Sequence, residues 1–220
     1  MLRCEDMAWF VGAKHYRLNL ELGDAEVLSV VGPSGCGKST WFRCWVGAHP
    51  WTGSVRLGDR QWTSLKEVVG WAPQNLVCEA QQSVESFLAD GLKYRARFRN
   101  WSFSMMMEAS LPWMEAFDLK GLDFKARVAK LSGGQKQRLN VIRAVVGQPQ
   151  VILLDEPFSG VDVVLRKRLW DFLIGKCREW GTPVIAISHD PAELQSYCSQ
   201  ELDFASNKDG LLECQRPGFS

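Results

Sequence analysis

The chain has 220 residues, which is enough for one large domain with a sizeable hydrophobic core and too few for a multi-domain enzyme. Its 26 basic residues nearly balance its 25 acidic residues, and the net charge of +1 argues against a global attraction to nucleic acid or an anionic membrane surface. Seven scattered cysteines without a Cys-x-x-Cys pair favour neither a disulfide framework nor a zinc site.

The beginning of the chain does not read as a membrane-targeting segment. Glu5 and Asp6 stand where a signal peptide is apolar. No apolar run approaches the roughly 20 residues that a transmembrane helix requires. We therefore expect a cytoplasmic protein.

Short apolar runs recur along the chain between longer helical stretches. They cover residues 26–31, 68–71, 151–154 and 184–187, and each is flanked by Gly, Pro or Asp. Runs of this kind are typical of strands buried on both faces in a parallel sheet that helices cover. The sequence therefore predicts an α/β core.

The segment from about residue 75 to residue 130 has a different composition. It is rich in Met, Phe and Arg, it lacks a β-branched run, and helix formers dominate at 84–98 and 104–117. We predict a single domain, residues 1–220, in which this segment is an inserted helical subdomain.

Tryptophan is frequent, with ten residues in the chain. Five of them lie between residues 41 and 71. Their large apolar rings predict core and interface packing rather than ligand binding.

The first motif that carries chemistry lies at residues 32–40. It satisfies the pattern G-x4-G-K-S/T with Gly32, Pro33, Ser34, Gly35, Cys36, Gly37, Lys38, Ser39 and Thr40. It follows a predicted strand and opens a predicted helix at 41–46, so its backbone N–H groups can cradle phosphate oxygens at a helix N-terminus. Lys38 would add charge for the β- and γ-phosphates, and Ser39 a hydroxyl for Mg2+. This motif alone indicates a nucleoside triphosphate.

Two carboxylates follow the apolar run at 151–154. Asp155 and Glu156 are adjacent, and Pro157 ends the strand. A lone carboxylate here could simply cap a turn, whereas two in succession can supply a metal ligand, Asp155, and a group that orients or deprotonates the attacking water, Glu156.

The most specific segment is LSGGQKQR, at residues 131–138. Ser132 is predicted to cap a helix whose first residues, Gly133 and Gly134, leave backbone donors open to an anion, and Gln135 follows them as a further expected nucleotide-binding residue. Alone, the segment could be a capped helix and nothing more. It resembles the signature motif LSGGQ-x-QR of ATP-binding-cassette (ABC) ATPases.

This resemblance implies roles for further residues, in the order in which the family carries its motifs. Gln74 matches the Q-loop glutamine, which contacts Mg2+ and water, and the segment Ser159 to Asp162 resembles the D-loop. His189 matches the switch histidine, which contacts the γ-phosphate. Without the resemblance, Gln74 would be read as a turn residue and His189 as a core histidine.

Two positions depart from the family pattern. Val11 stands at or near the place of the aromatic residue that stacks on adenine, with Trp9 and Phe10 just before it. A stack of Trp9 or Phe10 on adenine is therefore an expectation of its own. Asn140 stands where the family usually has Ala, and the sequence offers no physical account of it.

The resemblance implies a P-loop NTPase that hydrolyses MgATP as a head-to-tail dimer, a homodimer for identical chains. The expected catalytic residues are Glu156, His189, Gln74 and Lys38, and the expected Mg2+ ligands are Ser39, Gln74 and Asp155. The chain looks most like the small bacterial solute importers, including the thiamine-transporter branch. Expected partners are transmembrane permease subunits and a solute-binding protein, with no nucleic acid, at the inner face of the cell membrane.

Two alternatives belong to other functional classes. The first is an ABC ATPase without solute transport, acting in the assembly of an envelope or iron-sulfur complex or in regulation. The second is a nucleotide-binding module without hydrolysis, which the presence of Glu156 and His189 disfavours.

Overall fold

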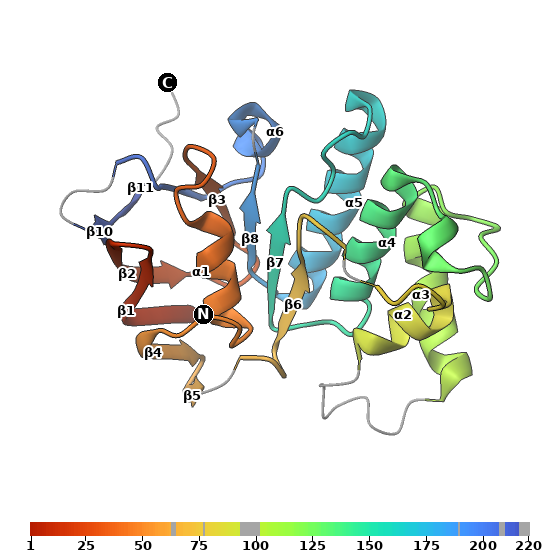
Figure 1. The fold of residues 1–220 in the computed structure, drawn as a ribbon, viewed down its shortest axis with the longest axis horizontal. Helices are drawn as coiled ribbons and strands as arrows, with labels where there is room; N and C mark the ends of the chain where they lie inside the picture. The colour runs from red at the N-terminus through yellow and green to blue at the C-terminus, as the bar shows by residue number, and fades with distance from the viewer. Residues whose placement is uncertain (63–64, 77, 93–101, 189, 207–209, 216–220) are drawn as a thin grey trace.

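Two β-sheets organise the part of the chain that the structure describes. The computed structural model describes residues 1–62, 65–76, 78–92, 102–188, 190–206 and 210–215. In this part, a six-stranded sheet has the spatial order β11 (Cys214–Gln215), β9 (Gln200–Asp203), β3 (Val27–Val31), β8 (Val184–Ile187), β7 (Val151–Asp155) and β6 (Val69–Ala72). The strands pair in parallel except β11, which is antiparallel to β9 (Figure 1). The four predicted strands are confirmed as β3, β6, β7 and β8.

The smaller sheet has five strands within the described residues, and the apolar-run argument did not predict it. Its order is β10 (Leu211–Leu212), β2 (Lys14–Leu22), β1 (Leu2–Val11), β4 (Thr52–Leu57) and β5 (Arg60–Trp62). Except for β10, which runs parallel to β2, these strands pair antiparallel. Along β2 buried and exposed residues alternate from Tyr16 to Leu22, because one face of this sheet packs on the core and the other faces solvent.

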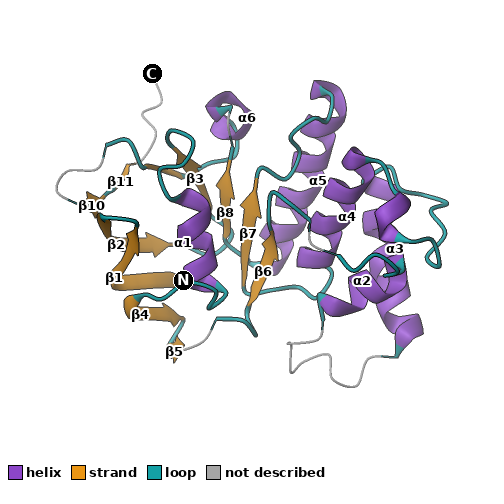
Figure 2. Cartoon of the chain, in the orientation of Figure 1, coloured by secondary structure: helices purple, strands orange, loops and turns teal. Residues whose placement is uncertain are grey.

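Helices cover both faces of the six-stranded sheet. They are α1 (Lys38–Trp45), α4 (Gly133–Val145), α5 (Val163–Trp180) and the short α6 (Pro191–Gln195). Alternate residues of β7 belong to different cores: Val151 and Leu153 pack with α1 and the five-stranded sheet, whereas Ile152 and Leu154 pack with α4 and α5. Figure 2 shows α1 between the strands of the two sheets, and α4 and α5 on the opposite side of the six-stranded sheet.

The helical segment lies beyond α4, away from the five-stranded sheet (Figure 1). Its helices are α2 (Val84–Asp90) and α3 (Phe103–Ala116), followed by a 3-10 turn, η2 (Val128–Lys130). Ser83 and Ser102 cap α2 and α3 by accepting hydrogen bonds from backbone N–H groups. The helix predicted at 104–117 is confirmed. The helix predicted at 84–98 is confirmed up to Asp90, and its residues 93–98 lie outside the described residues. The subdomain boundary near 75 and 130 stays a prediction.

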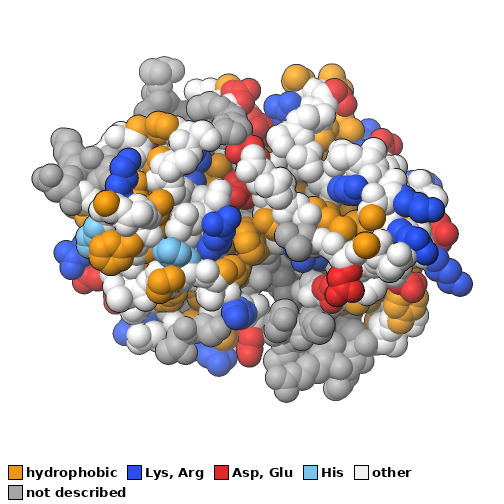
Figure 3. Space-filling view, in the orientation of Figure 1, with side chains coloured by type: hydrophobic (Ala, Val, Ile, Leu, Met, Phe, Trp, Pro, Cys, Tyr) orange, Lys and Arg blue, Asp and Glu red, His pale blue; other side chains and the backbone are white. Residues whose placement is uncertain are grey.

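Charged side chains of both signs are mixed over the face seen in Figure 3. Among the described residues, no helix is both long enough and apolar enough to cross a lipid bilayer.

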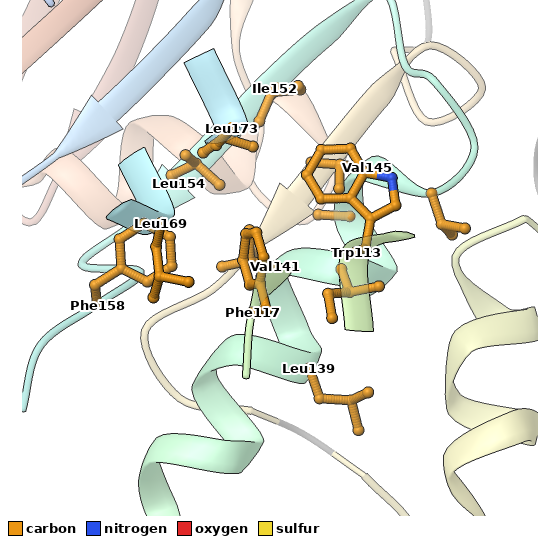
Figure 4. Close-up of a cluster of buried hydrophobic side chains, with 14 of the residues drawn as sticks. Trp113, Phe117, Leu139, Val141, Val145, Ile152, Leu154, Phe158, Leu169 and Leu173 are labelled. Atoms are coloured by element: carbon orange, nitrogen blue, oxygen red, sulfur yellow. The ribbon is translucent and has the colours of Figure 1, made fainter. Parts of the chain in front are cut away.

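The larger core joins α3, α4 and α5 to the sheet. Figure 4 shows Val145 of α4 close to Trp113 of α3, Val141 of α4 close to Phe117, the residue that follows α3, and Leu169 of α5 close to Phe158. Burying each such large apolar side chain contributes about 1.5–3 kcal/mol. In the smaller core, Trp41 and Trp45 of α1 are fully buried, which confirms core packing for these tryptophans. The two cores together fix the loops at the carboxyl ends of the strands.

Candidate functional site

The candidate site lies where the parallel strands of the six-stranded sheet end. Val30 of β3 and Asp155 of β7 both lie opposite Ile187 of β8, so the ends of these strands are level. The arrowheads of β6, β7 and β8 point to one edge (Figure 1). Loops that follow parallel strands meet at such an edge, which is where α/β folds place ligands.

The loop from Gly32 to Thr40 needs glycine for geometric reasons. The backbone φ angles of Gly35 and Gly37 are +75° and +113°, in the left-handed region that other residues rarely adopt. A Cβ atom on Gly37 would also lie 2.9 Å from Cγ2 of Val11. Directly after Gly37, α1 begins at Lys38. The loop therefore forms a concave turn at a helix N-terminus, which fits a phosphate group.

Lys38 points back into this loop. Its side chain is 7% exposed, and its Nζ donates hydrogen bonds to the carbonyl oxygens of Gly32 at 2.7 Å and Pro33 at 2.9 Å. The hydroxyl of Tyr16 donates to the carbonyl oxygen of Cys36 at 2.6 Å and holds the loop from the other sheet. The positive charge of Lys38 is therefore held inside the loop, where it would meet an anionic phosphate.

Asp155 ends β7 beside the phosphate loop. Asp155 is 4% exposed, and its carboxylate accepts a hydrogen bond from the Ser39 side chain. Burial raises the pKa of Asp155, and the nearby charge of Glu156 raises it too, whereas the Ser39 hydrogen bond and the charges of Lys38 and Arg43 lower it. The neighbouring oxygen atoms of Ser39 and Asp155 are the type of donor that Mg2+ prefers.

Glu156 follows in a strained backbone conformation. Its φ angle is +52°, and its N–H donates to the carbonyl oxygen of Ile187 at 3.0 Å. The side chain of Gln74, which follows β6, donates from Nε2 to Oε2 of Glu156 at 2.7 Å. A non-glycine residue at positive φ is uncommon and marks a position that the surrounding structure holds in place. The structure thus brings Gln74, Asp155 and Glu156 to one edge of the sheet.

The signature segment begins α4 as the sequence predicted. Ser132 accepts a hydrogen bond at Oγ from the N–H of Gln135 at 3.3 Å, and the Gln135 side chain accepts one from the Ser132 N–H at 3.0 Å. This reciprocal pair is a capping box. A Cβ atom added to Gly133 or Gly134 would meet no atom within 4 Å. The first turn of α4 is therefore open to a ligand.

The phosphate loop and the signature segment line two different pockets. A pocket of about 420 Å3 lies between Gln74, Gly133, Gly134 and Ser159. A different pocket, of about 710 Å3, is lined by residues of the phosphate loop together with His15 and Phe204. The two halves of the expected ATP site are therefore apart within one chain.

The segment between β7 and α5 joins the signature helix to the acidic pair. Ser159 accepts a hydrogen bond at Oγ from Nε2 of Gln137 at 2.7 Å. Asp162 caps α5 by accepting from the N–H of Leu165 at 2.9 Å.

Comparison with known proteins decides the family. The sequence model of the ABC transporter family matches residues 16–159. The chain belongs to the ABC transporter family. It is 34% identical over 200 residues to the spermidine/putrescine import ATP-binding protein PotA of Marinobacter nauticus, with 89% of this chain and 52% of PotA covered. It is 30% identical over 197 residues to the taurine import ATP-binding protein TauB of Shigella dysenteriae, with 89% of this chain and 75% of TauB covered.

The chain spans about half the length of PotA, and it spans 47% of the glycerol-phosphate import ATP-binding protein UgpC of Cupriavidus pinatubonensis. Among solved structures, a dimeric bacterial ABC transporter cassette superposes with a TM-score of 0.81 at 20% identity and full coverage of both chains. A bacterial ABC exporter with ATP bound superposes with a TM-score of 0.74 at 21% identity, covering 98% of this chain and 38% of the exporter. The chain therefore has the α/β fold of ABC cassettes, with the predicted P-loop core.

Three residues discussed with the ABC resemblance, His189, Trp9 and Phe10, lie outside the described group of site residues. His189 lies outside the described residues, so its contact with the γ-phosphate stays a prediction. Trp9 is 1% exposed, and its ring stacks on Tyr16 at 5.5 Å and on Trp41 at 6.1 Å. The expectation that Trp9 could stack on adenine is therefore wrong, because its ring fills the core. Phe10 is 60% exposed, and its ring lies 4.7 Å from that of His15.

Sequence reasoning did not predict the exposed apolar pair at the start of α5 or the buried hydrogen bonds of Asn140. Val163 and Val164 are 76% and 83% exposed, and their position directly after Asp162, which caps α5, was the sequence signal for their exposure. Asn140, the departure from the family pattern, is 3% exposed and donates from Nδ2 to the carbonyl oxygen of Pro73 at 2.8 Å. A buried amide needs such partners, but the sequence does not reveal which ones.

Proposed function

We propose that this chain is the ATP-hydrolysing subunit of an ABC transporter and powers solute import through separate transmembrane subunits. The observation that carries the proposal is the grouping of Lys38, Asp155, Glu156 and Gln74 at one edge of the sheet. A positive charge, a metal-binding carboxylate and a second carboxylate in reach of water are the groups that triphosphate hydrolysis requires.

The residues of the phosphate loop fit ATP, and those beside it fit Mg2+. The loop 32–40 would hold the β- and γ-phosphates through its backbone N–H groups, with the Lys38 ammonium against them. Ser39, Asp155 and Gln74 supply oxygen atoms for the metal ion. When bound, Mg2+ would neutralise negative charge on the β- and γ-phosphate oxygens.

In the proposed reaction, Glu156 orients the attacking water and accepts its proton. Gln74 already donates to Oε2 of Glu156, so the amide holds the carboxylate at the edge of the sheet where the attacking water would bind. Lys38 stabilises charge that develops on the transferred phosphoryl group. His189 would contact the γ-phosphate as in the family pattern.

A second copy of the chain would complete each ATP site. The phosphate loop and the signature segment line separate pockets, and the open N-terminus of α4 at Gly133 and Gly134 suits an anion. In a head-to-tail dimer, Ser132, Gly133, Gly134 and Gln135 of one copy would face the triphosphate held by Lys38 of the other. Two-fold symmetry then makes both sites equivalent. The similarity to a dimeric cassette supports this arrangement.

The named relatives support the proposed direction of transport. PotA and TauB are import ATP-binding proteins for different solutes, which supports import and leaves the solute open. The fold alone does not give the direction, because the ATP-bound exporter shares it. Permease subunits in the membrane and a solute-binding protein would be the partners, with the chain at the cytoplasmic face. The relatives favour transport over a role in complex assembly.

The test is MgATP turnover by the purified chain and its Lys38→Ala variant. We expect turnover in the wild type and none in Lys38→Ala, because this variant lacks the charge inside the phosphate loop. Lys120→Ala is the matched control, since Lys120 pairs with Glu115 on the exposed surface of the helical segment; it should retain turnover. Unchanged turnover in Lys38→Ala would overturn the proposal. Co-purification of a polytopic membrane protein would support transport, and co-purification of only a soluble assembly factor would contradict it.

A further inference from the structure

Three polar side chains of α4 reach three different segments of the molecule. Gln137, Asn140 and Arg143 are spaced by three residues and therefore lie along one face of the helix. Gln137 donates to Ser159 at 2.7 Å, Asn140 donates to the Pro73 carbonyl at 2.8 Å, and Arg143 donates from Nη2 to the Trp71 carbonyl at 3.3 Å. This face of the signature helix is thus bound to the strand β6 and to the loops that follow β6 and β7.

The central member of this set, Asn140, is fixed at both ends of its amide. Its Nδ2 donates to Pro73, and its Oδ1 accepts from Nη2 of Arg143 at 3.0 Å. The guanidinium group of Arg143 also lies over the ring of Phe87, 4.8 Å from its centroid. Because Asn140 is 3% exposed, water does not compete for these bonds, and the amide has a single favoured orientation.

The Asn140 bond leads directly to the hydrolytic carboxylate. Pro73 precedes Gln74 in the chain, and Gln74 donates to Glu156 at 2.7 Å. The carbonyl that Asn140 binds belongs to the peptide unit between Pro73 and Gln74, and that unit is planar. The orientation of this peptide unit therefore influences where the Gln74 backbone lies and in which direction its side chain points.

We propose that Asn140 is a positioning residue that ties Gln74, and through it Glu156, to the helix that carries the signature segment. The inference rests on the proposed function, since it concerns the same hydrolytic site. An alanine at this position would have no side-chain N–H to donate to Pro73. In this chain the amide instead makes the Q-loop follow the signature helix, so movement of that helix is passed to the group that acts on water.

The experiment uses Asn140→Asp, which keeps the shape of the side chain and its acceptor for Arg143 but has no N–H for the Pro73 carbonyl. We expect kcat for MgATP to fall between about 10-fold and 100-fold, the scale of a small misplacement of catalytic groups. The KM for ATP should stay unchanged, because the phosphate loop is not touched. The matched control is Thr182→Val, which removes another buried hydrogen bond to a proline carbonyl, that of Pro149 at 3.0 Å, at the opposite end of the sheet. It should retain kcat.

A second measurement does not depend on hydrolysis. Hydrogen exchange followed by mass spectrometry should show faster exchange of the backbone amides of residues 74–76 in Asn140→Asp than in the wild type, with no such change in Thr182→Val. The inference would be overturned if Asn140→Asp and the wild type exchanged equally fast at residues 74–76. It would also be overturned if the wild type hydrolysed ATP and Asn140→Asp had the same kcat. If the wild type itself does not hydrolyse ATP, the proposed function fails, while the exchange result still decides the role of Asn140. If Asn140→Asp does not fold, Asn140→Ala removes the same N–H donor together with the acceptor for Arg143, and the same two measurements apply to it.

Discussion

Gln74 donates a 2.7 Å hydrogen bond to Glu156, although 82 positions separate the two residues in the chain. The bond joins the loop after β6 to the end of β7, two strands that lie side by side in the sheet. It holds the Glu156 carboxylate by one oxygen, while the positive φ angle of Glu156 fixes the backbone beneath it. The group proposed to act on water is therefore held in place before any substrate arrives.

Replacement of Glu156 should separate ATP binding from hydrolysis. Glu156→Gln keeps the size and hydrogen-bonding reach of the side chain but removes its charge and basicity. Turnover should fall by about 100-fold or more, the scale of a lost general base, while Lys38, Ser39 and Asp155 still bind MgATP. ATP bound only at the closed interface stabilises that interface, so dimers should persist in size-exclusion chromatography with MgATP.

Ser132→Arg is the control for the dimer. It places bulk and charge at the open N-terminus of α4, so it should bind ATP without forming dimers. A Glu156→Gln protein that stays monomeric while loaded with ATP would contradict the composite site, unless the transmembrane subunits are required to bring the two copies together.

Asp155 should lower the stability of the nucleotide-free protein at neutral pH. Burial raises its pKa above the ordinary value of 3.8, so the folded state binds a proton more readily than the unfolded state does. The wild type therefore keeps its full stability below pH 3.8 and loses part of it as the pH rises through the folded-state pKa. Asp155→Asn should have the larger free energy of unfolding at pH 7, and the difference should close at acidic pH. Urea denaturation without Mg2+ or nucleotide measures this.

Asp171 on α5 provides a control of opposite sign. Hydrogen bonds from Tyr197 and Lys167 lower the pKa of Asp171, so its contribution to stability is present above pH 3.8 and is lost as the pH falls through the folded-state value. Asp171→Asn should therefore be less stable than the wild type at pH 7. Equal curves for Asp155→Asn and the wild type over the whole pH range would refute the role assigned to burial.

Alkylation of Cys36 should block ATP hydrolysis. Its thiol is half-buried in the phosphate loop, with Sγ 3.8 Å from Nζ of Lys38. A group attached there would occupy the space expected for phosphate, so activity should fall to background, and ATP added first should protect the protein. The measurement is the fraction of each variant's own activity that remains after alkylation. Cys36→Ser should keep its activity, and equal sensitivity of both proteins would mean that another cysteine is responsible.

Phe10 should contribute to ATP affinity, whereas Trp9 should not. Phe10 is exposed, and its ring contacts that of His15, which lines the pocket beside the phosphate loop. Aromatic stacking is worth about 0.5–1.5 kcal/mol, so Phe10→Ala should weaken ATP binding about 2-fold to 12-fold. Trp9→Phe removes part of a buried ring and should lower the free energy of unfolding with little change in affinity. Fluorescence titration with ATP and urea denaturation give the two values. An unaltered affinity in Phe10→Ala would place adenine elsewhere.

The strands of the five-stranded sheet follow a sequence pattern different from that of the strands buried on both faces. Along β2, buried and exposed residues alternate, and the same period of two places Trp9 inside and Phe10 outside on β1. Contiguous apolar runs mark strands buried on both faces, such as β7, but not strands of which only one face is buried. Use of the alternation would have rejected Trp9 as an adenine platform.

The sequence by itself determined those features that contiguous residues specify. The phosphate loop from Gly32 to Thr40, the cap at Ser132 and the buried strand before Asp155 each depend on neighbours a few positions away. Only the tertiary structure decided which side chains meet, as Gln74 meets Glu156 and Asn140 meets Pro73, 67 positions apart. Hydrogen bonds of this kind depend on the order of strands in the sheet and on the rotation of α4 about its axis, which packing of the whole core sets and no local pattern encodes.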